Sequence, residues 1–160
     1  YAFYTDADLP YGTKPIAAML AQLQSGQADL VLANRNLAVD DATVSHTVAR
    51  EITHRVYSLF IRSLFPFNFT DTLAGLKGMN QALLKGVLPK LTIDRWSFDV
   101  ELILAATRLK FKVAEAPVAL HSAGHSNLSI QRDAPDMIAE VLRIWLRDKR
   151  GFYKEAGRRR

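Results

Sequence analysis

The alternation of strand and helix patterns in the first 33 residues constrains the fold most. Residues 1–5 are mostly aromatic or β-branched, as in a strand, and residues 15–24 carry apolar side chains at helical spacing before Ser25-Gly26 ends the pattern. Residues 29–33 are apolar after Asp29, which is typical of a strand buried on both faces. A strand, a helix and a strand in this order form a βαβ unit, so we predict an α/β fold with parallel strands.

The remaining chain continues as helices and strands separated by polar segments. Its patterns predict helices at 45–65, 80–88, 98–109 and 135–149, and a strand at 112–118. Residues 68–75 are rich in turn-forming side chains, and residues 121–132 are polar and rich in Gly, Ser and His, which predicts a loop.

The composition excludes several kinds of site. The chain has 160 residues, 49% of them apolar, which is enough to bury the core of one domain. It has no cysteine, so disulfides, Cys-ligated zinc and thiol catalysis are excluded, and its 4 histidines are scattered. A bound metal should therefore have oxygen ligands. No apolar run approaches the length of about 18 residues that a membrane-spanning helix needs, so we expect a soluble or peripheral segment.

The positive charge lies in the C-terminal tail. Residues 143–160 hold eight basic and two acidic side chains, a net charge of +6, so the total of +5 leaves −1 for residues 1–142. Basic residues of the stretch 149–160 would suit anionic lipid headgroups. The alternative is a nucleic-acid-binding module, which the slightly acidic body of the chain disfavours.

The strongest local signal for chemistry is Asp6-Ala7-Asp8, directly after the first strand. Two carboxylates at the carboxyl end of a strand can hold one hard divalent ion while a diphosphate supplies further oxygens, and open α/β sheets bind ligands at that edge. The alternative is a solvated acidic turn or a helix cap.

The acidic pair opens the first of five segments whose order identifies a family. They are DADLPY (6–11), ADLVLANR (28–35), DTLAGLKGM (71–79), RWSFDVELI (95–103) and KVAEAPV (112–118). With these motifs the chain resembles family 2 glycosyltransferases of the polyprenyl-phosphate type, those similar to dolichyl-phosphate mannose synthase and dolichyl-phosphate glucosyltransferase.

The resemblance implies a GT-A-like mixed sheet flanked by helices. It implies transfer of a hexose, with inversion, from a nucleotide diphosphate sugar to a polyprenyl phosphate, with Mg²⁺ or Mn²⁺. The matched segments correspond to the C-terminal two thirds of such a domain (1–132), followed by an amphipathic helix and basic tail (133–160). We therefore expect the N-terminal nucleotide-binding strands to be absent and the fragment alone to be inactive.

The resemblance also assigns roles to the metal- and phosphate-binding residues. Asp8 would be the direct metal ligand, and Asp6 would assist through the metal or the ribose. Arg35 and Arg50 would handle the diphosphate and the acceptor phosphate, because guanidinium groups stabilise the charge that develops on a leaving diphosphate. The alternative is that Arg35 is an ordinary charged residue at the end of a strand and that Arg50 lies on the solvated face of a helix.

Other positions would line the substrate site. The segment with Asp71, Gly75 and Lys77 would lie beside the sugar, although Asp, Thr and Gly are also common in plain turns. Trp96 belongs to the same motif as Asp99 and is expected to contact substrate. His125 stands in a loop where relatives often have Arg, so it could substitute as a donor.

Asp99 distinguishes two mechanisms. A phosphate monoester is already an anionic nucleophile near pH 7, whereas a sugar hydroxyl needs a general base, and Asp99 would be that base in a hydroxyl-glycosylating relative. The structural alternative is that Asp99 and Glu101 order the start of a helix, whose positive end favours carboxylates.

A lipid-phosphate acceptor requires contact with a membrane, and the expected location is peripheral, at the cytoplasmic face. The 45–69 segment combines basic residues with aromatic ones, as an interfacial helix does. These residues are Arg55, Arg62, Tyr57, Phe60, Phe65, Phe67 and Phe69. The alternative is an ordinary amphipathic helix that packs on the core.

Overall fold

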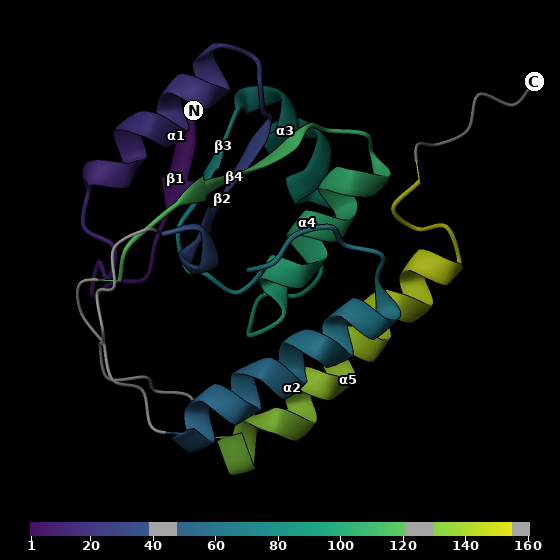
Figure 1. Ribbon diagram of the computed structural model, residues 1–160. Coiled ribbons are helices and arrows are strands. Elements are labelled where there is room, and N and C mark those ends of the chain that lie inside the picture. Colours follow the sequence, from purple (N-terminus) through teal and green to yellow (C-terminus); the bar gives the residue numbers. More distant parts are fainter. Residues whose placement is uncertain (39–47, 121–129, 155–160) are drawn as a thin grey trace, which may run out of the picture.

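The structure is a computed structural model that describes residues 1–38, 48–120 and 130–154, with side chains described from residue 55 in the second range and from residue 132 in the third. Helices and a four-stranded sheet form an α/β fold in these residues (Figure 1). The strands are β1 (Ala2–Tyr4), β2 (Leu30–Asn34), β3 (Lys77–Met79) and β4 (Val113–Pro117). The α/β class with a mixed sheet, as predicted, is confirmed and is compatible with part of a GT-A-like fold.

The strand order β1-β3-β2-β4 corrects the prediction of parallel neighbours at the start of the chain. β1 and β2 run in the same direction, but β3 lies between them and is antiparallel to both. The parallel pair is formed instead by β2 and β4, with Leu32 opposite Glu115. The βαβ pattern identified the elements correctly and their adjacency wrongly, because a third strand occupies the intervening position.

β3 was not predicted because it is three residues long and contains Lys77 and Gly78, which are not strand signals. Gly78 is needed where it stands. A Cβ atom at this position would lie 2.4 Å from Cε1 of Phe3 on the neighbouring strand, so any larger residue would displace the ring. Met79 at the end of β3 is buried and faces the core.

Helices cover both faces of the sheet, as Figure 1 shows. Alternate residues of β2 point to opposite sides: Leu30 and Leu32 join the core formed with α3 (Gln81–Val87) and α4 (Phe98–Arg108), whereas Val31 and Ala33 pack with α1 (Lys14–Gln24). All of β2 is buried, which confirms the prediction. The bounds of these three helices agree with the predicted ones to within a residue.

Two longer helices, α2 (Val48–Leu64) and α5 (Ile130–Lys149), lie side by side beyond α4 (Figure 1). α5 joins the core through Val141 and Ile144, and Arg108 of α4 binds Asp148 through two hydrogen bonds of 2.7 and 2.6 Å. α5 begins at Ile130 rather than at the predicted Pro135, which lies inside the helix. Residues 121–129 of the predicted loop, residues 45–47 of the predicted helix and residues 155–160 of the tail lie outside the described residues.

The aromatic residues after Arg55 belong to the core, which is the second of the two alternatives. Phe65 and Phe67 are buried, and their rings stack with centroids 5.4 Å apart. Tyr57, Phe60 and Phe69 are partly buried and pack against the same core. Within the described residues, no helix is both long and apolar enough to cross a bilayer.

Glu101 connects α4 to two neighbouring segments. Its side chain is fully buried and accepts hydrogen bonds from the backbone N–H groups of Thr92 (2.7 Å) and Ile93 (2.8 Å) and from the hydroxyl of Tyr153 (2.5 Å). This explains why a carboxylate lies among the buried residues 100–106 of α4: Glu101 orders the 92–93 segment and the chain after α5 rather than the start of its own helix.

Replacing Glu101 by Ala should therefore destabilise the fold strongly. The substitution leaves these donors, two of them in buried hydrogen bonds, without their acceptor and removes packed atoms, so we expect the free energy of unfolding to fall by about 3 kcal/mol or more. Chemical denaturation measures this value. Asp94→Ala, at an exposed position nearby, is the control and should change it by less than about 0.5 kcal/mol. A loss below about 1 kcal/mol for Glu101→Ala, close to what surface substitutions cost, would contradict this role.

Candidate active site

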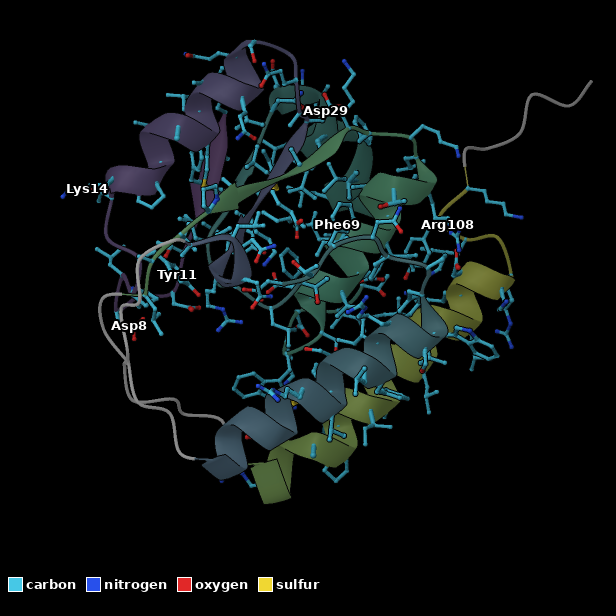
Figure 2. All side chains as sticks on the ribbon, in the orientation of Figure 1. Asp8, Tyr11, Lys14, Asp29, Phe69 and Arg108 are labelled. Carbon is cyan, nitrogen blue, oxygen red and sulfur yellow. The ribbon has the colours of Figure 1, made fainter. Side chains whose placement is uncertain are left out.

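The strand directions bring the predicted site residues to one edge of the sheet. β1 and β2 both end there, and β3 begins there because it runs the opposite way. Asp6 and Asp8 follow β1, Arg35 follows β2, and Asp71 and Gly75 precede β3. Figure 2 shows Asp8 and Tyr11 at this end of the sheet and Asp29 at the other.

The acidic pair lies on a tight turn. The backbone N–H of Leu9 donates to the carbonyl oxygen of Asp6 (3.0 Å), and Leu9 has φ of 46°, a left-handed conformation that is unfavourable for a branched side chain. Such conformations often occur where a loop positions functional groups. Both Asp6 and Asp8 are exposed on this turn.

Gly75 makes room for Asp6. A Cβ atom at residue 75 would lie 2.0 Å from Oδ2 of Asp6, so the carboxylate occupies the space that a side chain would fill. The group that approaches the backbone at Gly75 is thus a carboxylate of the protein itself. Burial raises the pKa of Asp6, and the nearby charges of Asp8 and Asp99 raise it further, while Lys77 and Arg35 oppose the shift.

Asp99 lies in the first turn of α4, between a buried cation and a tyrosine. Lys77 is fully buried, and its Nζ lies 3.0 Å from Oδ2 of Asp99 and donates to the carbonyl oxygen of Ala74 (2.6 Å). The hydroxyl of Tyr4 donates to Oδ1 of Asp99. Burial and, second, the Asp99 charge raise the pKa of Tyr4, so this hydroxyl keeps its proton at neutral pH.

Arg35 and Asp71 form a paired salt bridge. Nε and Nη2 of Arg35 donate to the two oxygens of Asp71 at 2.7 and 2.8 Å, and the backbone N–H of Arg35 donates to the same carboxylate at 3.1 Å. Asp71 is buried, whereas the Arg35 side chain is 28% exposed. The fork fixes the plane of the guanidinium, and that geometry suits the recognition of phosphate oxygens.

Sequence reasoning gave no role to two tyrosines at this edge. Tyr4 is the last residue of β1, two positions before Asp6. Tyr11 is buried beside Arg35 and Asp71, and its pKa is raised mainly by burial. Their positions in the sequence could have indicated both tyrosines, because Tyr4 ends the strand before the acidic pair and Tyr11 is the last residue of the motif DADLPY.

The remaining predicted residues are placed less fully. Trp96 is 37% exposed, just before the start of α4. The side chain of Arg50 and all of His125 lie outside the described residues.

The carboxylates at this edge suit a hard divalent cation that is coordinated partly by the protein and partly by a bound substrate. Carboxylate oxygens are the ligands that Mg²⁺ and Mn²⁺ prefer, and the carboxylates of Asp8 and Asp99 lie close enough to Asp6 to raise its pKa beyond the effect of burial. Among residues 1–38, 48–120 and 130–154, no three His, Asp or Glu side chains are grouped so that they could hold a metal ion. The described residues therefore fit such a cation only if another molecule completes its coordination.

The raised pKa of Asp6 gives a prediction with a definite sign. The folded state binds the Asp6 proton more tightly than the unfolded state does, so this stabilisation is present below the ordinary pKa of 3.8 and is lost as the pH rises through the folded value. At pH 7 without metal, Asp6→Asn should thus raise the melting temperature slightly, on the order of 1 °C because the group is exposed.

Thermal unfolding at several pH values checks this prediction. The advantage of Asp6→Asn should disappear at pH 3, and Asp94→Asn, an exposed position away from the cluster, should show no such pH-dependent gain. A lower melting temperature for Asp6→Asn than for the wild type at pH 7 would contradict the electrostatic description.

Comparison with known proteins agrees with the motifs. The chain is 24% identical over 142 residues to the glycosyltransferase AglD of Haloferax volcanii, a match that covers 89% of this chain and 22% of AglD. It is 25% identical over 158 residues to the dolichyl-phosphate β-glucosyltransferase of Dictyostelium discoideum, covering 96% of this chain and 48% of that protein. The enzyme of the same name from Saccharomyces cerevisiae is 28% identical over 85 residues, covering 53% of this chain and 25% of its own length.

In each of these matches the chain spans less than half of the relative's length. No family model and no solved structure matches the chain. The named relatives are all glycosyltransferases, and two of them align with most of this chain. In its motifs, and in sequence over most of its length, the chain is similar to glycosyltransferases, among them enzymes named dolichyl-phosphate β-glucosyltransferase.

Proposed function

We propose that this chain supplies the metal- and diphosphate-binding part of a glycosyltransferase that moves a hexose, with inversion, from a nucleotide diphosphate sugar to a polyprenyl phosphate. The observation that carries the proposal is the convergence of Asp6, Asp8, Arg35 and Asp99 at one sheet edge. Relatives named as dolichyl-phosphate β-glucosyltransferases support the choice of donor and acceptor.

In this proposal Asp8 binds Mg²⁺ or Mn²⁺ directly, and Asp6 assists. The metal, when bound, neutralises charge on the diphosphate leaving group. Asp6 and Asp8 suit this task because they repel one another without a cation, and because Gly75 leaves room for the Asp6 carboxylate beside β3. The two carboxylates leave the coordination shell to be completed by diphosphate oxygens and water.

Arg35 contributes positive charge to the same diphosphate. Its guanidinium is oriented by Asp71, and a preoriented donor stabilises developing negative charge without having to reorganise during the reaction. Arg50 is proposed for the acceptor phosphate on the basis of the family motif alone.

The surroundings of Asp99 favour a phosphate acceptor over a sugar hydroxyl. One oxygen of Asp99 pairs with the buried ammonium of Lys77 and the other accepts from Tyr4, so the carboxylate holds β1, β3 and α4 together. A base that abstracts a proton from a hydroxyl must face the acceptor, whereas an ionised phosphate needs no base. In the alternative mechanism, transfer to a sugar hydroxyl, Asp99 is that base.

Asp99→Asn separates the two mechanisms in a transfer assay on the full-length protein that contains this chain, with Mn²⁺, UDP- or GDP-hexose and a polyprenyl phosphate. Because either change breaks the Lys77–Asp99 ion pair, for a phosphate acceptor we expect kcat to fall about equally in Asp99→Asn and in Lys77→Met, whereas loss of a general base would cost Asp99→Asn alone a further factor of about 10²–10⁴. Asp8→Asn should abolish transfer. Absence of any hexosyl transfer to lipid phosphate by the wild-type protein would refute the proposal.

The pair α2 and α5 offers a surface for the membrane that carries the acceptor. Apolar side chains are exposed on both helices: Val56, Leu59, Ile138, Leu142 and Leu146. Exposed arginines accompany them at positions 55, 62 and 143. Apolar side chains flanked by basic ones suit the interface of an anionic bilayer, so we place the protein peripherally at the cytoplasmic face.

Vesicle cosedimentation tests this surface. The double variant Leu59→Glu and Leu142→Glu should lower binding to vesicles with about one third anionic lipid by at least tenfold, because it removes apolar contact and adds repulsion. Ala17→Glu with Ala18→Glu adds the same charge to the exposed face of α1 and is the matched control. Equal losses in the two double variants would show that net charge, and not this surface, governs binding.

A further inference from the structure

Glu115 links β4 to the segment that carries Asp71. It lies in the middle of β4, and its Oε1 accepts hydrogen bonds from Nδ2 of Asn34 (2.8 Å) and from the backbone N–H of Thr70 (3.0 Å). Nδ2 of Asn34 also donates to Oγ1 of Thr70 (2.7 Å). The three residues thus form a closed set of hydrogen bonds between β2, β4 and the chain before β3.

Two members of this set directly precede the partners of the salt bridge. Asn34 is followed by Arg35, and Thr70 is followed by Asp71. Asn34 also orders the backbone around Arg35. Its Oδ1 accepts from the backbone N–H of Asn36 (2.8 Å) and so caps the single helical turn η1 (Arg35–Leu37). The hydrogen bonds of Glu115 therefore hold both ends of the Arg35–Asp71 pair.

Both Asn34 and Thr70 need the hydrogen-bond acceptor that Glu115 provides. Asn34 is fully buried, and a buried amide that loses its acceptor is costly. Thr70 lies in a segment outside any helix or strand, so its position depends on bonds such as the one from its N–H to Glu115. A carboxylate oxygen can accept two hydrogen bonds at once, and Glu115 uses Oε1 in that way.

We infer that Glu115 is a positioning residue that fixes the guanidinium of Arg35 through Thr70 and Asp71, and thereby sets how tightly the site holds a diphosphate. The inference rests on the proposed function for the identity of the ligand. The orientation of Arg35 itself can be measured without that ligand.

The experiment compares three variants. Glu115→Ala removes the acceptor, and Glu115→Gln keeps a carbonyl oxygen that can accept both bonds. Asp29→Ala is the matched control at the opposite end of the same two strands, where Asp29 accepts from Nδ2 of Asn80 (2.6 Å) and from the backbone N–H of Lys112 (2.8 Å). This control destabilises the β2–β4 pair without touching Thr70 or Asp71.

The first readout is the NMR signal of the Arg35 Nε–H group, assigned with Arg35→Lys. Its hydrogen exchange should be about tenfold faster in Glu115→Ala and close to the wild-type rate in Glu115→Gln and Asp29→Ala. The second readout is the Kd for inorganic pyrophosphate with Mg²⁺, which should rise about tenfold in Glu115→Ala and less than twofold in the other two.

The outcomes separate this inference from the proposed function. Equal exchange of the Arg35 Nε–H group in Glu115→Ala and Asp29→Ala would overturn the inference, whatever happens to pyrophosphate. Faster exchange in Glu115→Ala alone, with no pyrophosphate binding by the wild type, would uphold the positioning of Arg35 and refute the diphosphate site.

Discussion

The buried ammonium of Lys77 is the constraint on which the arrangement of the site depends. Lys77 lies on the inserted strand β3 with no exposed surface, so its charge must be balanced inside the protein. Asp99 at the start of α4 balances the charge, and Ala74 supplies a carbonyl acceptor. Because the other Asp99 oxygen accepts from Tyr4 of β1, one ion pair fixes two strands and a helix relative to one another.

The electrostatics at this edge of the sheet depend on two ion pairs and on the acidic pair Asp6 and Asp8. Lys77 pairs with Asp99, and Arg35 pairs with Asp71, so these four charges are balanced within the protein. Asp6 and Asp8 remain as an acidic pair on a strained turn, and the pKa of Asp6 is raised first by partial burial and then by the charge of Asp8. A divalent cation would relieve that repulsion, and its charge would in turn attract a diphosphate.

Local patterns predicted most of the elements and the polar edge, but not the connections between strands. The burial of β2 on both faces and the bounds of α1, α3 and α4 follow from the apolar patterns of the sequence alone. β3 could not be predicted in this way, because Lys77 and Gly78 are explained only by the partners they meet, Asp99 and Phe3. The hydrogen bonds of Tyr4 and Glu115 join segments that are far apart in the sequence, so these contacts emerge only in three dimensions.

Manganese binding tests the central claim, that this edge is a metal–diphosphate site, most directly. Bound Mn²⁺ can be measured by electron paramagnetic resonance with and without inorganic pyrophosphate. Since the described residues offer only part of a coordination shell, pyrophosphate should tighten Mn²⁺ binding by about tenfold or more, and Asp8→Asn should abolish this gain. Mn²⁺ binding that is equal in the wild type and Asp8→Asn, or that pyrophosphate leaves unchanged, would contradict the claim.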